Sequence, residues 1–343
     1  MTSHEYVLFD PLFDERGAES MVRLCERFGA YGMYSQENVE SEIGRGLTQR
    51  HDAVRNYLRS GGMRGEEEPI QVAAARTNYF REEYAYGTNV LIEGIEPFLF
   101  HEGFVEAARQ IHGRAVVEPA IVFANLMVPG QELALHTDVP EFRGANRKLH
   151  PQWLLVAMRH SGLFEDWRMP IATGVAWFHD ADGGEFVFYP DGAGGPRASH
   201  KVAYNTAVLI DTDSVFHGVD RVASDGGPLP RLRPGMQLGF DGDGQWSIRD
   251  GDAPGEVVER YAWEELRFSV SWKAYCFADE AERDAWRSHT DDLDLDRTLA
   301  TLVDDLRARG RIGTATPPPS ELAIHIIDEY IRFPVPAGPT EEQ

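Results

Sequence analysis

The chain has 343 residues, of which 42% are hydrophobic, so it can bury a full core in one large domain or two ordinary ones. Its formal charge is −23, from 33 basic and 56 acidic residues, and this surplus repels nucleic acid phosphates and anionic membrane surfaces. We therefore expect neither nucleic acid nor a membrane as a partner. No apolar run approaches the ~18 residues that a spanning helix needs, and no signal peptide is evident, so the expected location is the cytoplasm.

The first third of the sequence is predicted to be largely helical. In residues 18–28 the side chains of Met21, Leu24 and Phe28 recur every three or four positions, which is typical of an amphipathic helix. The other features expected here are a short strand at 6–11, an irregular segment at 29–44, a surface loop at 61–68, and helices at 51–59 and 102–111. The two cysteines of the chain, Cys25 and Cys276, lack metal-ligand spacing and are expected to be reduced and packed.

A row of aromatic residues follows at 79–86, comprising Tyr79, Phe80, Tyr84 and Tyr86. These rings can pack in the core against a sheet, or they can form a wall over the mouth of a site. The strand-rich half of the chain begins at 116–128. Asn125 and Met127 share one face of this strand, which could line a pocket; a buried asparagine bonded to backbone is the alternative.

A Pro129-Gly130 turn leads to a second apolar run at 133–136, which ends in His136-Thr-Asp138. Side chains two apart on a strand point the same way, so His136 and Asp138 can bind one metal ion. An aspartate before Val-Pro can equally cap a turn. A third ligand would decide between these interpretations.

That ligand is offered by residues 208–219, a β-rich run, a turn of Asp, Thr and Ser, and a short apolar strand that carries His217. Two imidazoles and one carboxylate on one side of an ion form the facial triad of non-haem Fe(II) oxygenases, which leaves positions for a co-substrate and O2. Zinc accepts the same ligands, so the triad leaves both metals open.

Residues 264–272 are predicted to form a strand with Arg267, Ser269 and Ser271 on one face and Phe268, Val270 and Trp272 on the other. A guanidinium beside a hydroxyl suits a planar carboxylate, because it binds bidentately and stays charged when buried. The alternative is a surface strand with one ion-paired arginine.

Between the two ligand segments, Gly183-Gly184-Glu185 separates two strand-like runs within residues 176–190. Together with His136-x-Asp138, His217 and Arg267-x-Ser269 in that order, this segment resembles the Fe(II)/2-oxoglutarate-dependent dioxygenase superfamily, prolyl-4-hydroxylase-like enzymes in particular. The resemblance covers residues 121–275. It rests on the ordered set of four motifs.

The resemblance implies a mixed α/β fold with a mainly β core, the double-stranded β-helix or jelly roll. It implies that His136, Asp138 and His217 bind Fe(II), and that 2-oxoglutarate chelates the iron while O2 takes the last position. Arg267, helped by Ser269 or Ser271, would hold the far carboxylate of 2-oxoglutarate, and Asn125 would line its pocket. Hydroxylation of a C–H bond is the expected outcome, with desaturation or ring formation as alternatives.

The predicted substrate is a small molecule such as an amino acid or a biosynthetic intermediate. The alternatives are a peptide or protein side chain, a cupin-like metalloenzyme that does not use 2-oxoglutarate, and a barrel that serves only as a binding module. Residues 139–171 are longer than a hairpin needs and locally rich in basic side chains. We expect this segment to cover the substrate mouth, with Arg143 or Arg147 contacting an acidic group of the substrate.

We predict a single catalytic domain over residues 1–343. Its parts are a helical N-terminal part at 1–115, a β-helix core at 116–278 with insertions at 139–171 and 220–261, and C-terminal helices at 279–333. The second insertion is expected to contain a hairpin at 236–240 and 245–249. Because it lengthens the connection from His217 to Arg267, Arg221 is the alternative partner for 2-oxoglutarate, and His179 and His200 are the alternative metal ligands.

Overall fold

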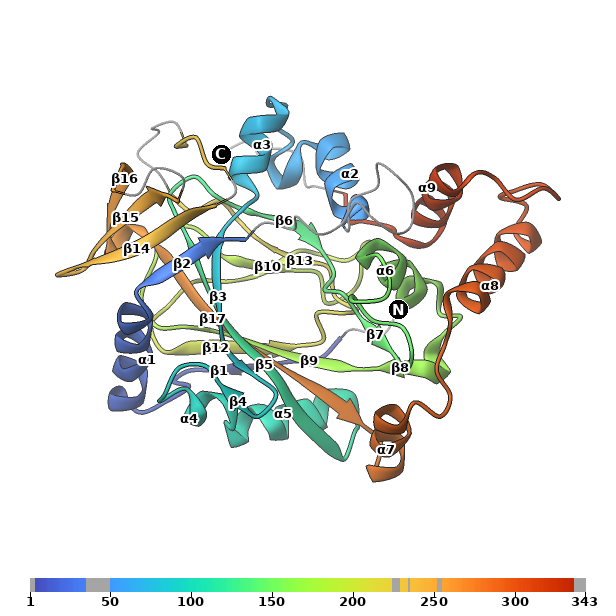
Figure 1. Cartoon of the computed structure of the whole chain (residues 1–343), viewed down its shortest axis with the longest axis horizontal. Coiled ribbons are helices and arrows are strands. Elements are labelled where there is room, and N and C mark those ends of the chain that lie inside the picture. Colours follow the sequence, from blue (N-terminus) through green and yellow to red (C-terminus); the bar gives the residue numbers. More distant parts are fainter. Residues whose placement is uncertain (1–3, 35–49, 224–228, 234, 252–254, 336–343) are drawn as a thin grey trace.

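The computed structural model describes residues 4–34, 50–223, 229–233, 235–251 and 255–335. Within these residues the strands form one large sheet, one small sheet and a two-stranded ribbon, with helices around them (Figure 1). The large and small sheets pack against each other through a shared apolar cluster that includes Val175, Trp177, Phe186 and Val208. This arrangement of mainly antiparallel sheets confirms the predicted double-stranded β-helix.

The large sheet has eleven strands among the described residues. In spatial order ten of them are β1 (Tyr6–Phe9), β12 (Thr206–Ile210), β9 (Ile171–Trp177), β17 (Arg267–Phe277), β5 (Val116–Met127), β3 (Phe80–Tyr86), β2 (Ala30–Met33), β14 (Met236–Gly242), β15 (Gln245–Asp250) and β16 (Val257–Ala262). The eleventh, β4 (Asn89–Val90), pairs with β3. The sheet therefore joins strands from the N-terminal region to Phe277, whereas the elements described after it are helices.

The small sheet has the order β11 (Ala198–His200), β10 (Phe186–Phe188), β13 (His217–Val219) and β6 (Leu133–His136). Strand β7 (Glu141–Phe142) pairs separately with β8 (Arg168–Met169). In the small sheet β13 and β6 are antiparallel, and His217 lies directly opposite His136. This register places two of the predicted metal ligands side by side.

Helices flank both sheets. They are α1 (Glu15–Phe28), α2 (His51–Ser60), α3 (Ile70–Arg76), α4 (Glu96–Leu99), α5 (Glu102–His112), α6 (Gln152–Ser161), α7 (Glu280–Ser288), α8 (Leu295–Ala308) and α9 (Pro319–Tyr330), with 3-10 turns at Gly62–Arg64, Glu165–Trp167 and Trp263–Glu265. In the main core, side chains from α1, α4 and α5 pack on the outer face of the large sheet. A second core joins α6, α8 and α9 to side chains of β6 and β10 in the small sheet. No helix of the described residues is long and apolar enough to cross a bilayer.

Local chemistry explains where α1 begins and ends. The side chain of Asp14 accepts a hydrogen bond from the backbone nitrogen of Gly17 over 2.8 Å, which satisfies a free amide of the first turn. Gly29 ends the helix with a positive φ of 79°, a conformation that glycine adopts without a steric penalty. The buried positions of this helix include Met21, Leu24 and Cys25, as the predicted periodicity requires.

The N-terminal part differs from its predicted helical character. Within the described residues of 1–115, strands β1, β2, β3 and β4 all join the large sheet. Strand β2 lies in the segment expected to be irregular, 29–44, of which residues 35–44 fall outside the described ones. It pairs with β14 and β3, which are distant in sequence, so the tertiary partners rather than a local pattern make this segment a strand.

The second insertion extends the large sheet beyond β2. The predicted hairpin is present as β14 and β15, paired from Met236 with Asp250 onward, and β16 adds a third antiparallel strand. Figure 1 shows these strands projecting at one end of the molecule. Strand β17 then returns to the centre of the large sheet, between β9 and β5.

Candidate metal centre and cavity

Three potential metal ligands converge between the two sheets. His136 ends β6, Asp138 follows two residues later, and His217 begins β13. The Nε2 atom of His136 lies 3.7 Å from Oδ1 of Asp138, and the Nε2 atom of His217 lies 3.9 Å from Oδ2. One ligand atom from each residue lies within 4.8 Å of the others, a spacing that fits one shared ion.

Backbone carbonyls orient both imidazoles. The Nδ1 atom of His136 lies 2.7 Å from the carbonyl oxygen of Ala134, and Nδ1 of His217 lies 3.0 Å from that of Val215. A carbonyl only accepts, so each Nδ1 donates a proton to it, and in the neutral tautomer Nε2 is the nitrogen whose lone pair can bind a metal. Burial lowers the pKa of His217 to about 3, so this imidazole is neutral and can ligate at neutral pH.

Lys273 holds the carboxylate of Asp138. Its Nζ donates to Oδ2 of Asp138 over 2.6 Å and to Oγ1 of Thr173 over 3.0 Å. Burial opposes ionisation of Asp138, but the charge of Lys273 and the neighbouring imidazoles outweigh it, so the pKa of this carboxyl lies well below its usual range. Asp138 is therefore an anion that is ready to bind a cation.

Arg267 lies in the same cavity and is almost fully buried, with 2% of its surface exposed. Its Nε donates to the carbonyl oxygen of Gly184 over 2.7 Å, and one terminal nitrogen donates to Oγ of Ser269 over 3.1 Å. No carboxylate among the described residues lies within 4.0 Å of it. Burial alone lowers the pKa of Arg267 to about 9, so the side chain remains a cation without a counter-charge.

Asn125 lies beside this arginine. It is opposite Ser269 in the pairing of β5 with β17, and its side chain lines the cavity. Its Oδ1 atom is buried and has no hydrogen-bond partner. Because a buried polar atom without a partner costs free energy, a ligand or a water would bind here.

The cavity has a volume of about 770 Å³, within the range of small-molecule sites. Alternating residues of β17 form its floor: Arg267, Ser269, Ser271, Lys273 and Tyr275. The opposite face of the strand, with Phe268, Val270 and Trp272, packs in the main core. Tyr79 and Tyr86 line the cavity, whereas Phe80 and Tyr84 are core residues, so the aromatic row serves both purposes considered from the sequence.

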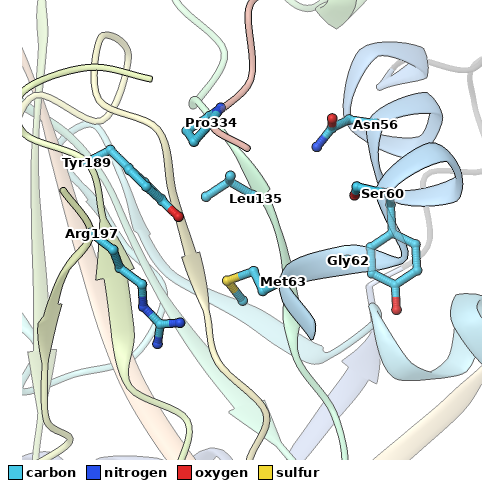
Figure 2. Close-up of a pocket in the computed structure, with 9 residues that line it drawn as sticks. Asn56, Ser60, Gly62, Met63, Leu135, Tyr189, Arg197 and Pro334 are labelled. Carbon is cyan, nitrogen blue, oxygen red and sulfur yellow. The ribbon is translucent and has the colours of Figure 1, made fainter. Parts of the chain in front are cut away.

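A second pocket lies near Leu135, the residue before His136 (Figure 2). Met63, Tyr189 and Arg197 are among the side chains that surround it. The space measures about 30 Å³, which is enough for about one water and too small for a substrate. The large cavity is therefore the better candidate for a substrate site.

Several alternatives considered from the sequence lie elsewhere. Arg221 pairs with Glu66 and Glu132 and does not line the cavity. The ring nitrogen Nε2 of His179 bonds to the carbonyl of Leu266, and that of His200 lies 3.2 Å from Oγ1 of Thr206. Neither histidine belongs to the ligand cluster, which among the described residues consists of His136, Asp138 and His217.

The long segment at 139–171 contributes only in part to the cavity. Arg147 lines it, as do Glu141, Asn146 and Lys148. Arg143 does not: its guanidinium binds Asp291 over 2.9 Å and the carbonyl of Asp166 over 2.5 Å. This arginine thus ties the segment to the connection between α7 and α8, and helix α6 is buried in the second core.

The cavity residues that the sequence analysis did not single out include Lys273, Tyr275 and Arg81. Lys273 and Tyr275 continue the alternation of Arg267, Ser269 and Ser271, so extending that pattern would have found them. Arg81 lies on β3 opposite Asn125 of β5. No local signal marks Arg81, because only the pairing of distant strands brings it to the cavity.

A double-stranded β-helix with two imidazoles and one carboxylate converging between its sheets defines a candidate mononuclear metal centre. No family model and no curated protein matches the sequence. Among solved structures, the chain is similar to a Pseudomonas putida prolyl-4-hydroxylase at 10% identity and a TM-score of 0.39, covering 80% of this chain and 93% of that one.

Two further similar structures are of enzymes that bind or depend on 2-oxoglutarate. HygX from Streptomyces hygroscopicus, solved with nickel, 2-oxoglutarate and hygromycin B, has 9% identity and a TM-score of 0.39, covering 80% of this chain and 84% of that one. The α-ketoglutarate-dependent carbocyclase SnoK from nogalamycin biosynthesis has 9% identity and a TM-score of 0.41, covering 83% and 87%. At such identities and TM-scores the chemistry has to be argued from the residues of this chain.

Proposed function

We propose that the chain is a non-haem Fe(II)- and 2-oxoglutarate-dependent oxygenase that oxidises a C–H bond of a small molecule. The observation that carries the proposal is the buried guanidinium of Arg267, which has no carboxylate partner among the described residues and lines the same cavity as the ligand triad. A buried cation without a counter-charge is costly, and an anionic ligand would remove that cost.

The residues present fit both groups. His136, Asp138 and His217 would hold the metal, and the cavity leaves space on its open side for further ligands. Arg267 and Ser269 would bind the distal carboxylate of 2-oxoglutarate. The unpartnered Oδ1 of Asn125 is an acceptor, so it would take a hydrogen bond from a water or from a donor on a ligand and not from the carboxylate. Bound iron would supply the redox chemistry that couples decarboxylation of 2-oxoglutarate by O2 to oxidation of the substrate.

The protein's own contribution is position and charge. The carbonyl bonds of the two histidines fix the orientation of each ring with Nδ1 toward the backbone, and Lys273 keeps Asp138 ionised. The hydrogen bond from Arg267 to Gly184 fixes the guanidinium, so that its remaining donors face a carboxylate without reorganisation. Phe123, Val175 and Phe186 give part of the cavity wall an apolar lining.

Anaerobic titration with Fe(II) and 2-oxoglutarate tests the proposal. We expect a weak visible charge-transfer band that requires both the metal and the keto acid, because only a chelate of both produces it. Tight zinc binding with no band would instead support a cupin-like metalloenzyme. If the protein bound no metal, the result would support the alternative of a barrel that serves only as a binding module.

The substrate class is tested by succinate release. Free amino acids, carrier-bound intermediates and peptides are screened with wild-type protein, iron, O2 and 2-oxoglutarate. We expect a small molecule to stimulate succinate release in proportion to its own oxidation. Stimulation by peptides alone would replace the small-molecule assignment with side-chain hydroxylation.

A further inference from the structure

One cation of the cavity, Arg81 on β3, lies against aromatic rings and not against a close carboxylate. The centre of its guanidinium is 3.6 Å from the ring centroid of Phe123 and 5.0 Å from that of Tyr34. Its ion pair with Glu83 is long, at 3.5 Å, and the Glu83 side chain is about half exposed. Because a guanidinium has five N–H donors in its plane, the contacts of Arg81 with Glu83 and Tyr79 leave other donors for a ligand while the face of the group stacks on a ring.

Two more cations line the cavity from the long segment. The Nε atom of Arg147 is 3.9 Å from Glu141, whose other oxygen accepts a hydrogen bond from Tyr275 over 2.8 Å. Lys148 lies 5.8 Å from the ring centroid of Tyr86 and has no carboxylate within 4.0 Å among the described residues. We refer to Arg81, Arg147 and Lys148 as the rim cations.

Other arginines at the same cavity have close partners. Arg287 binds Glu118 over 2.7 Å, and Arg50 binds both oxygens of Asp52 over 3.1 Å. Among the described residues, these two arginines thus have a carboxylate within 3.1 Å, whereas the ion pairs of Arg81 and Arg147 are longer, at 3.5 and 3.9 Å, and Lys148 has none within 4.0 Å. The rim cations therefore concentrate positive potential at the cavity of a strongly acidic protein, where it attracts anions.

The rim cations are separate from the co-substrate position. Arg81 is opposite Asn125, and Asn125 is opposite Ser269, so Arg81 stands two strands away from the strand of Arg267. Two strand spacings amount to about 10 Å. One distal carboxylate bound to Arg267 and Ser269 therefore leaves Arg81 free to bind a second anionic group.

We propose that the substrate to be oxidised carries an anionic group, a carboxylate or a phosphate, which the rim cations bind. Its body would lie against the aromatic side chains of Tyr79, Tyr86 and Phe123, which line the same cavity. This inference rests on the proposed function, since it assigns 2-oxoglutarate to Arg267. It replaces the predicted contact by Arg143, whose donors are engaged elsewhere, and retains Arg147.

Calorimetry on the full chain tests this inference without turnover. The protein is loaded with Mn(II) and saturating 2-oxoglutarate, and the probes are 2-naphthoate, 2-naphthyl phosphate and the neutral 2-naphthamide. We expect at least one anionic probe to bind tenfold or more tightly than the amide, with affinity that falls as NaCl is raised. The tighter of the two anionic probes distinguishes a carboxylate from a phosphate.

Variants locate the binding. Arg81→Gln and the double variant Arg147→Gln/Lys148→Gln should each weaken the preferred anionic probe about tenfold or more, and Arg81→Lys should recover part of the loss. Arg260→Gln, on the projecting strand β16, is the matched control and should bind like wild type. Equal affinity for the anionic probes and the amide, or unchanged affinity in both rim variants, would overturn the inference.

The same titration separates the two proposals. Mn(II) and 2-oxoglutarate are added before any probe, and their binding reports on the proposed function alone. If they bind while the anionic probes show no preference, only the inference about the substrate fails. If 2-oxoglutarate does not bind to the metal-loaded protein, the proposed function is contradicted, and the inference that rests on it is contradicted as well.

Discussion

Arg267 and Gly184 form one unit: the Nε of the arginine donates to the glycine carbonyl over 2.7 Å, and the glycine leaves room for the arginine side chain. A Cβ atom added at Gly184 would lie 2.6 Å from Cδ of Arg267, closer than such atoms approach in proteins. Gly184 also has a φ of 64°, in the left-handed region. The Gly-Gly-Glu turn therefore positions the arginine as well as reversing the chain.

Gly184→Ala should displace Arg267 and weaken 2-oxoglutarate binding tenfold or more, because the new methyl group would lie only 2.6 Å from Cδ and force the arginine side chain to move. Left-handed backbone at alanine should also cost about 1–2 kcal/mol of stability. Gly192→Ala is the control, since Gly192 has a similar φ of 79° but no atom within 4 Å of the added Cβ. Calorimetry of 2-oxoglutarate and urea unfolding separate the two effects. Equal 2-oxoglutarate affinity in both variants would show that the close approach is unimportant.

Arg267→Ala should raise the dissociation constant of 2-oxoglutarate far more than that of the metal. Truncating one partner of a buried, charge-assisted pair costs on the order of 2–5 kcal/mol, because the other charge is left without a partner. Arg267→Lys should restore only part of the affinity, since an ammonium lacks the planar fork. Arg221→Ala removes pairs with Glu66 and Glu132 and should leave 2-oxoglutarate binding intact. If only Arg221→Ala weakened 2-oxoglutarate binding, Arg221 and not Arg267 would be the residue that binds the co-substrate.

His136→Ala, Asp138→Ala and His217→Ala should each reduce metal content to background while the protein stays folded. Each change removes one of three ligand atoms that lie within 4.8 Å of one another. Elemental analysis after dialysis against Fe(II) or Mn(II) measures the loss, and circular dichroism checks the fold. His325→Ala, on the surface of α9, is the control. Wild-type metal content in any of the three ligand variants would exclude that residue as a ligand.

Acid should destabilise the metal-free protein through His160. This imidazole stacks on Phe216 with ring centroids 5.2 Å apart, and burial, reinforced by Arg159, lowers its pKa from 6.5 to about 4. The unfolded chain therefore binds the proton more readily, and the stability that His160 contributes is complete above pH 6.5 and declines as the pH falls toward 4. The decline is about 1.4 kcal/mol per pH unit in that interval, or roughly 2 kcal/mol between pH 6.5 and 5.

Urea unfolding at these two pH values checks the prediction. His160→Phe keeps a ring against Phe216 but cannot titrate, so its difference in unfolding free energy between pH 6.5 and 5 should be smaller than that of wild type by roughly 2 kcal/mol. The absolute stability of the variant is immaterial, because the comparison is made across pH within each protein. An unchanged pH dependence would mean that His160 does not carry the acid sensitivity.

Local periodicity was sufficient to predict most of the elements that carry the site. Alternation along β17 separated Arg267, Ser269 and Ser271 from the core face, and the same rule placed His136 beside Asp138. The hairpin of β14 and β15 followed from two β-rich runs around a turn of Asp and Gly. These patterns are readable because they depend on neighbours within a few residues.

Some features follow from the sequence alone, whereas others depend on residues that are remote in sequence. The sequence alone determined the strand core, the order of the ligand motifs and the unusual accumulation of basic residues at 139–171. The tertiary structure alone decided that Lys273 binds Asp138, that Arg81 joins the cavity, and that Arg143 is engaged with Asp291 while Arg147 lines the cavity. The physical reason is that the role of a charged side chain depends on the charged group packed against it, and only folding brings the two together. In the pairs Lys273–Asp138 and Arg143–Asp291 the partners are more than a hundred residues apart in the sequence.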